Sequence, residues 1–137
     1  MALEGSPERQ KFTAEFAEKY MKQWHSPKLD DIIQKRRYKL EQERKDLIVK
    51  TKQWLDEVSP EFGIDEAYIF GSVTRVGKFR QDSDIDVAVE NINPEQYCLA
   101  ISLLSTYLER DVDIIRLNDC HFSDRIRQTG ILWKKTP

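Results

Sequence analysis

Three aspartates are the residues of this chain whose type and spacing most favour chemistry. Asp84 and Asp86 form an Asp-x-Asp pair at the start of the apolar run 85–89, and Asp113 lies inside a later run, 112–115. On a strand, side chains two residues apart project from the same face, about 7 Å from one another. Carboxylates that close repel one another unless water or a cation lies between them. Such oxygen donors suit Mg²⁺, which takes further ligands from water and substrate phosphates. The pattern therefore predicts a magnesium site.

A glycine-serine turn supplies the second chemical feature. Gly71 and Ser72 directly follow an apolar run. Glycine permits close backbone approach and unusual dihedral angles. Ser72 adds a hydroxyl and a backbone amide at the expected start of a short helix, which favours an anionic phosphate. The cations that follow, Arg75, Lys78 and Arg80, are candidates to neutralise a triphosphate, although each could equally be a solvated loop charge.

Two better-known motifs, the P-loop and the EF-hand loop, are matched only in part. A P-loop needs four residues between its glycines, whereas five separate Gly71 from Gly77, and a phenylalanine stands where the metal-binding hydroxyl belongs. The series that begins at Asp82 imitates a calcium-binding EF loop, but Val87 occupies the position that requires glycine. A lone Asp-x-Asp pair is weak evidence, because aspartates are ordinary at strand ends and turns. The glycine-serine turn and the later aspartate together favour the functional interpretation.

Short apolar runs, rich in β-branched and aromatic residues, alternate with helical patterns in the second half of the chain. They predict strands at 68–70, 85–89 and 112–115, and a small strand at 131–133. A helix is expected from Asn93-Pro94, where Gln96 is placed to complete a capping box, to about residue 110. A short helix is expected from Ser123 to Gly130.

Residues 28–58 have the pattern of one long, highly charged helix. Its apolar residues recur every seven positions, at Ile33, Leu40, Leu47 and Trp54. Ser59-Pro60 and Gly63 are expected to end it. Two interpretations stay open: the C-terminal half packs on the sheet while the basic N-terminal half is solvated, or the helix docks a partner.

The expected fold class is α/β (α+β), a small mixed sheet flanked by helices and preceded by the long helix. Residues 1–27 are predicted to be a tail and one helix that starts at Ser6-Pro7. Residues 28–137 are predicted to form the domain, with the long helix at 28–58 and the catalytic core at 61–137.

Composition narrows the class of protein. The chain has 137 residues, one domain's worth, with 39% hydrophobic and 34% charged residues. A formal net charge of −2 gives no reason to expect direct nucleic-acid binding. No apolar stretch approaches the roughly 18–20 residues that span a bilayer, and the N-terminus lacks a signal-peptide core, so a cytoplasmic location is expected. Cys98 and Cys120 form no metal-type spacing with either histidine.

The series of a Gly-Ser turn, a spacer, Asp-x-Asp and a later strand aspartate is similar to the nucleotidyltransferase superfamily that includes DNA polymerase beta. The compact chain most resembles the minimal nucleotidyltransferases, antitoxin-type partners of HEPN-domain ribonuclease toxins. The resemblance covers about 28–133, including 94–97 and 125–132. It departs in one respect: eleven residues, where the family commonly has ten, separate Ser72 from Asp84. One more residue in a surface hairpin is usually tolerated, so the metal site is expected to survive.

This resemblance implies a role for each motif residue. Gly71 and Ser72 would hold the nucleotide phosphates, and Asp84 and Asp86 would bind Mg²⁺. Asp113 would act as general base and as a further metal ligand. Two Mg²⁺ ions, with ATP as the substrate, would support transfer of AMP to a hydroxyl group. The implied acceptor is a tyrosine of a cognate HEPN toxin, which would make the chain an antitoxin.

Other functions stay open. The chain could instead neutralise a partner by contact alone, with the aspartates idle, or it could be a nucleotidyltransferase that acts on a small molecule such as an aminoglycoside. The short chain disfavours the small-molecule enzyme, because no second domain is expected to enclose such a substrate. A partner or a second copy of the chain would then complete the site.

Overall fold

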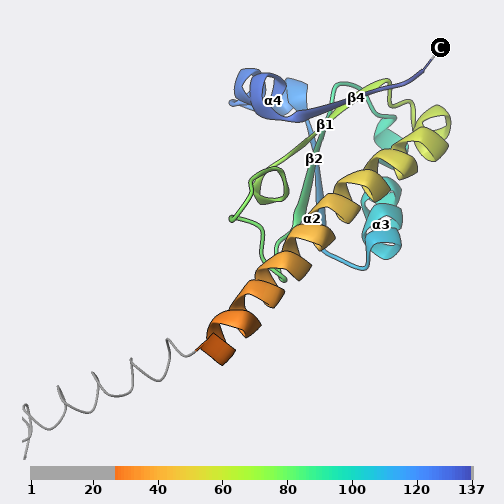
Figure 1. Ribbon diagram of the computed structural model, residues 1–137. Coiled ribbons are helices and arrows are strands. Elements are labelled where there is room, and N and C mark those ends of the chain that lie inside the picture. Colours follow the sequence, from red (N-terminus) through yellow and green to blue (C-terminus); the bar gives the residue numbers. More distant parts are fainter. Residues whose placement is uncertain (1–26, 137) are drawn as a thin grey trace, which may run out of the picture. The chain divides into compact units, whose positions relative to one another are not determined.

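The computed structural model describes residues 27–136. In chain order the elements are α2 (Pro27–Phe62), β1 (Glu66–Phe70), η1 (Ser72–Thr74), β2 (Ile85–Val89), η2 (Pro94–Gln96), α3 (Tyr97–Leu108), β3 (Val112–Arg116), η3 (Leu117–Asp119), α4 (Ser123–Thr129) and β4 (Ile131–Lys134), where η marks a 3₁₀ helix (Figure 1). The chain divides into two units after Tyr38. The helix expected at Ser6-Pro7 lies outside the described residues. Within the described residues, no helix is long and apolar enough to cross a membrane.

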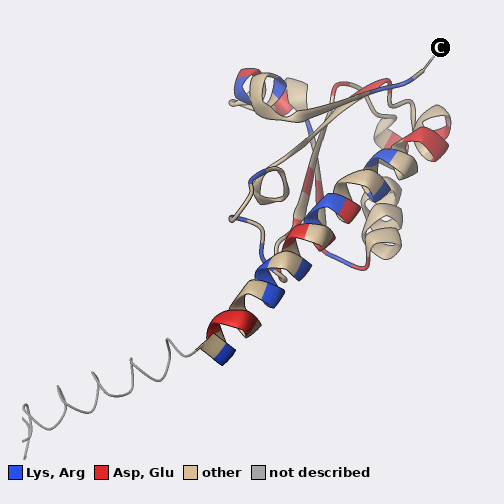
Figure 2. Ribbon diagram, in the orientation of Figure 1, with Lys and Arg blue, Asp and Glu red and all other residues tan. Residues whose placement is uncertain are grey.

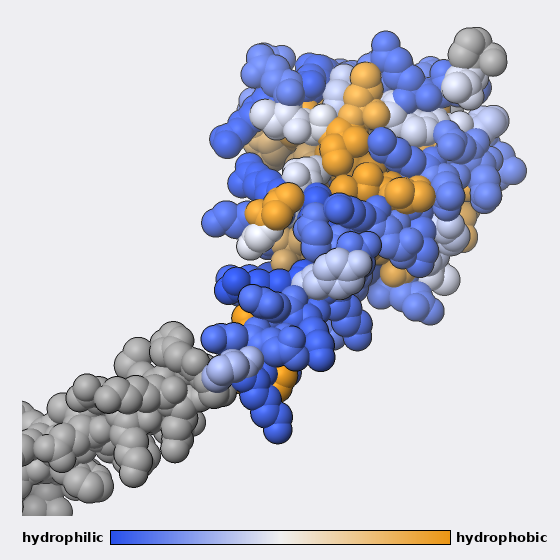
Figure 3. All heavy atoms as spheres, viewed as in Figure 1, coloured by the Kyte–Doolittle hydropathy of each residue, from blue (hydrophilic) through white to orange (hydrophobic). Residues whose placement is uncertain are grey.

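Helix α2 passes from the first unit into the second. Between Pro27 and Tyr38 none of its residues is buried, and this part of its surface is mostly hydrophilic in Figure 3. Its C-terminal half, in contrast, buries Leu47, Trp54 and Leu55. The predicted seven-residue spacing therefore marks core positions from Leu40 onward, whereas Ile33 is exposed.

The prediction that Ser59-Pro60 ends the long helix is wrong. Helix α2 continues to Phe62, and the break comes at Gly63, whose φ is 69°. Proline in a helix interior costs about 3 kcal/mol, because a hydrogen bond is lost. Continuing the helix buries Phe62 to 2% exposure and stacks its ring on Trp54 with centroids 6.0 Å apart. We attribute the continuation to this burial, since a buried side chain of that size contributes about 1.5–3 kcal/mol.

The four strands form one mixed sheet in the order β3-β2-β1-β4. Strand β1 pairs antiparallel with β2 and with β4, whereas β2 pairs parallel with β3. All four predicted strands are confirmed, with β1, β3 and β4 slightly longer than expected. The fold is therefore the predicted mixture of a small sheet and flanking helices.

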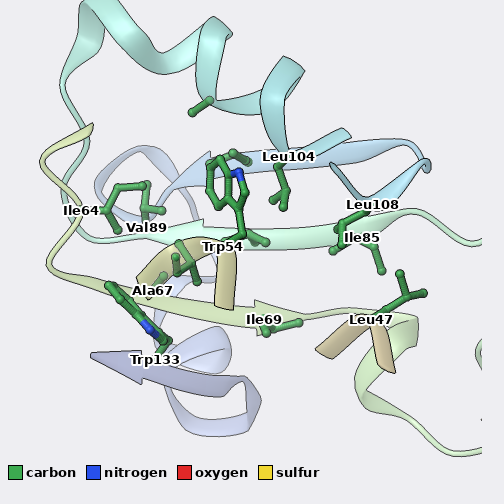
Figure 4. Close-up of a cluster of buried hydrophobic side chains, with 14 of the residues drawn as sticks. Leu47, Trp54, Ile64, Ala67, Ile69, Ile85, Val89, Leu104, Leu108 and Trp133 are labelled. Carbon is green, nitrogen blue, oxygen red and sulfur yellow. The ribbon is translucent and has the colours of Figure 1, made fainter. Parts of the chain in front are cut away.

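The helices are divided between the two faces of the sheet. Helices α2 and α3 cover one face, where the main core gathers (Figure 4). Ile69, Val87 and Ile114 point into this core, one from each of three neighbouring strands. The opposite face carries only a small cluster, in which Ile126 of α4 packs near Tyr68 and Ala88. This second face is the more open one, and it is the face that matters for the site.

The helix ends are partly as predicted. Helix α3 ends at Leu108, close to the expected residue 110, and α4 ends at Thr129, directly before Gly130, as expected. The predicted capping box is wrong, because the Asn93 side chain caps no backbone amide of η2. The Asn93 amide instead donates to Gln96 Oε1 at 3.3 Å. The short 3₁₀ turn η2 precedes α3 and moves the helix start to Tyr97.

Candidate active site

Gly71 forms a tight turn where β1 meets η1. Its φ is 83° and its ψ is −157°, a region that only glycine populates readily. A Cβ atom built on Gly71 would lie 2.3 Å from Asp86 Oδ2, far inside contact distance. Thr74 closes the turn, since its hydroxyl donates to Gly71 O at 2.7 Å. The glycine is thus required both by its backbone angles and by the carboxylate that lies against it.

The aspartates gather at the same end of the sheet. The register pairs Phe70 of β1 with Asp86 of β2, and Asp86 with Asp113 of β3. Asp86 and Asp113 lie two residues before Ala88 and Ile115, whose side chains pack on the α4 side, so all four share the open face. Asp84 lies just before β2, two residues from Asp86. The structure therefore brings together the three aspartates that the sequence pattern singled out, on the open sheet face that α4 covers in part.

The environment of Asp86 disfavours its ionised form. Burial first, and then the negative charges of Asp113 and Asp84, together raise the pKa of Asp86 from 3.8 to about 6. Among residues 27–136, none of the salt bridges involves these three aspartates. The cluster is therefore an uncompensated concentration of negative charge.

This raised pKa predicts a pH dependence of stability. Between pH 4 and pH 6 the folded state holds a proton on Asp86 that the unfolded state has released, so folding loses free energy as pH rises through that window. The test compares the free energy of unfolding of the wild type with that of Asp86→Asn in metal-free buffer. The difference, wild type minus variant, is expected to fall by about 1 kcal/mol between pH 4 and pH 6. This value is reduced for solvent screening, because Asp86 is partly exposed. Urea denaturation at several pH values measures it. A difference that does not change with pH would contradict the assignment.

A hollow of about 730 Å³ opens beside Gly71 on the α4 side of the sheet. We call it the arginine-lined hollow, because Arg75 and Arg125 both line it, together with Phe70, Gly71, Thr74, Phe122, Ile126 and Thr129. The predicted phosphate ligands divide here. Gly71 and Arg75 line the hollow, whereas Ser72 and Lys78 are not among its lining residues.

Arg110 holds the loop that leads from the glycine-serine turn to Asp84. Its guanidinium donates to Gln81 O and to Ser83 O, both at 2.8 Å, and pairs with Glu43 Oε1 of α2 at 2.5 Å. It also lies over the Phe79 ring, 4.9 Å from the centroid. The loop is therefore anchored on its Asp84 side despite the one-residue insertion, while Val76 near its tip is 75% exposed.

Replacing Arg110 with methionine is expected to lower the free energy of unfolding by about 2 kcal/mol. The reason is that hydrogen bonds to a charged group contribute roughly 1.5–3 kcal/mol, and two loop carbonyls would lose their donor. Urea denaturation measures the change, with Arg80→Met as the matched control at an exposed position of the same loop. Equal effects of the two substitutions would show that Arg110 does not anchor the loop.

Sequence reasoning missed three arginines that the fold brings to this region. Arg44 of α2 is 9% exposed and donates to Val73 O of η1 at 3.0 Å, so it holds the turn against α2. Arg110 supports the loop, and Arg125 lines the hollow. A charged residue at a predicted helix face or helix end gives no signal by itself. Only the packing of α2, α3 and α4 on the sheet distinguishes these arginines from solvated ones.

Comparisons with known proteins agree with this geometry. Residues 50–136 match the family model described as polymerase beta, nucleotidyltransferase. A solved structure titled "Crystal structure of the toxin-antitoxin with AMP-PNP" has a similar fold, with a TM-score of 0.51 and 21% sequence identity over 62% of this chain and 73% of that chain. No curated protein matches the chain significantly. The family model covers more than half of the chain and includes the turn, all three aspartates and the hollow. The chain therefore belongs to the polymerase beta-type nucleotidyltransferase family.

Proposed function

We propose that this chain is a Mg²⁺-dependent nucleotidyltransferase that moves AMP from ATP to a hydroxyl group of a partner protein. The observation that carries the proposal is the convergence of three aspartates from β2, β3 and the preceding loop opposite the Gly71 turn. Family membership supports the reaction class. The substrate, the metal and the acceptor are the parts that the proposal adds.

The residues fit a divalent cation in chemical type. Asp84, Asp86 and Asp113 supply oxygen ligands, which Mg²⁺ prefers, and their unpaired negative charge would be neutralised by it. Within residues 27–136, no group of three or more His, Cys, Asp or Glu side chains is placed so that it holds a metal ion as it stands. Rotation of the aspartate side chains and phosphate oxygens of the substrate would complete the ligand shell. Bound Mg²⁺ would neutralise developing charge on the transferred and departing phosphates.

The reaction balances with the groups at hand. The acceptor oxygen forms a bond to the α-phosphorus of ATP, and the bond from that phosphorus to the oxygen bridging it to the β-phosphorus breaks. Pyrophosphate leaves with the bonding electron pair. Asp113 is exposed and accepts the proton of the acceptor hydroxyl as general base. Arg75 and Arg125, which line the hollow beside Gly71, would neutralise the phosphates that leave.

We further propose that the acceptor is a tyrosine of a HEPN-type ribonuclease toxin, and that modification silences the toxin. The fold neighbour's title names a toxin-antitoxin and a nucleotide analogue for that protein. This chain also has a surface suited to a protein partner. Helix α3 carries no charged residue, as Figure 2 shows, yet Leu99, Leu103 and Tyr107 on it are 42–51% exposed at four-residue spacing. Exposed apolar side chains that adjoin one another on a surface commonly mark a site of protein–protein contact.

The exposed α3 stripe also favours a second candidate, an antitoxin that neutralises its toxin by contact alone. One experiment separates the two. The chain is incubated with ATP labelled at the α-phosphate, Mg²⁺ and any HEPN-type protein that is encoded beside it, and the Asp84→Ala/Asp86→Ala double variant is tested in parallel. Label on the partner only with intact aspartates supports transfer. Neutralisation that persists unchanged in the double variant, without label, supports contact.

A further inference from the structure

A second hollow lies at the β3 edge of the sheet, and rings and planar groups form much of its wall. It measures about 490 Å³. We call it the ring-lined hollow and define it by Tyr97, Ile115, Arg116, Asp119, His121 and Phe122. Tyr97 comes from the start of α3, Ile115 and Arg116 from β3, and the others from η3 and the segment that follows it. Nothing in the proposed reaction so far uses these residues.

The wall of the ring-lined hollow is held in place and offers an unused donor. The Arg116 guanidinium lies over the Tyr97 ring, 4.6 Å from its centroid. The Tyr97 hydroxyl donates to Ile114 O of β3, which fixes the ring against the strand. Among the described residues, Arg116 Nε is the buried side-chain nitrogen or oxygen that has no hydrogen-bond partner. Because Nε itself is shielded from solvent, the outer guanidinium nitrogens of Arg116, which lines the hollow, are the donors open to a ligand there.

The two hollows lie at opposite ends of the aspartate row. The register places Phe70, Asp86 and Asp113 side by side across three strands. The arginine-lined hollow begins at Phe70 and Gly71, and the ring-lined hollow begins at Ile115, two residues beyond Asp113 on the same face. Phe122, which is 55% exposed, lines both. A molecule with an anionic end and a ring end could therefore lie across the carboxylates with one end in each hollow.

We infer that the ring-lined hollow binds the base of the nucleoside triphosphate whose phosphates lie near Gly71. This inference rests on the proposed function and adds to it the place of the base. The side chains of Phe122 and His121 supply rings on which a base can stack. A base edge carries both donors and acceptors, and the hollow offers both, with Asp119 as acceptor and the Arg116 guanidinium as donor.

The test compares ATP with inorganic tripolyphosphate, which has the anionic chain but no base. Both are titrated into the full-length chain in the presence of Mg²⁺, and the dissociation constants are measured by calorimetry. The wild type is expected to bind ATP about tenfold or more tighter than tripolyphosphate, because stacking of a base on aromatic side chains typically gives that much. His121→Ala/Phe122→Ala is expected to remove this preference. His121→Ala alone, whose ring lines only the ring-lined hollow, is expected to reduce the preference and to leave tripolyphosphate binding unchanged. Gln128→Ala, at an exposed position of α4 outside both hollows, is the control.

Each other outcome overturns the inference in a distinct way. Equal affinity of the wild type for the two ligands would mean that no base site exists. Equal weakening of both ligands by the double variant would place the rings at the phosphates. If the double variant raised the KM for a tyrosine amide acceptor and left ATP binding unchanged, the ring-lined hollow would bind the acceptor and not the base. Binding of neither ligand, with no AMP transfer, would remove the proposed function itself. Should the double variant fail to fold, His121→Ala alone, at an exposed position, carries the same comparison.

Discussion

Asp86→Asn is expected to lower the rate of AMP transfer about 10³-fold while raising the stability of the metal-free chain at neutral pH. The rate falls because asparagine keeps the shape of the side chain but removes the charge that would hold the cation, and such electrostatic stabilisation is worth several kcal/mol. Stability rises because Asp86 is a partly buried carboxylate beside Asp113 and Asp84, with its pKa raised to about 6. Removing its charge at pH 7 relieves that repulsion.

The two opposite effects make this substitution more informative than a loss of activity alone. A residue that serves only the fold loses activity because the protein unfolds, whereas a strained functional residue is commonly unfavourable for stability. Transfer of labelled AMP and urea denaturation, with and without Mg²⁺, measure the two effects. Asp82→Asn is the matched control, an exposed aspartate in the preceding loop. If Asp82→Asn lost as much activity as Asp86→Asn, the overall negative charge of the loop, and not the position of Asp86, would explain the result.

Gly71→Ala is expected to lower the free energy of unfolding by about 1–3 kcal/mol and the rate of transfer about 10²-fold. Part of the cost comes from the backbone, since φ 83° with ψ −157° is strained for any residue with a Cβ. The rest comes from the Cβ itself, which would lie 2.3 Å from Asp86 Oδ2 and push that carboxylate out of position. A displacement of about 1 Å at a catalytic group commonly costs this much in rate.

Gly77→Ala is a control that separates the two contributions. Gly77 also has a positive φ, 81°, but a Cβ there would meet no atom within 4 Å. It therefore reports the backbone cost of a positive φ without a collision. Thermal or urea unfolding and the transfer assay measure all variants. If Gly77→Ala lost as much activity as Gly71→Ala, the contact between Gly71 and Asp86 would have no special role.

Local sequence patterns were sufficient to predict the strands and the turn. β-branched and aromatic runs placed β2 and most of β1 and β3, because a strand's preference for such residues is local. Side chains alternate between the two faces of a strand, and this local rule placed Asp84 and Asp86 on the same side of the chain. The Gly71-Ser72 turn followed from the special freedom of glycine next to an apolar run. The end of α2 was missed because Phe62 outweighs Pro60 only when the core that buries it is present.

The assembled site depended on long-range contacts that no short pattern contains. The register that sets Asp86 beside Asp113 is decided by how β2 and β3 pair, 27 residues apart in sequence. Arg44 and Arg110 became supports of the turn and the loop only because α2 and the end of α3 pack beside them. The two hollows exist because the short α4 leaves much of one sheet face open. Spacing along the chain thus determined which groups are available, and tertiary packing decided which of them meet, because contact between distant residues depends on the burial of the whole core.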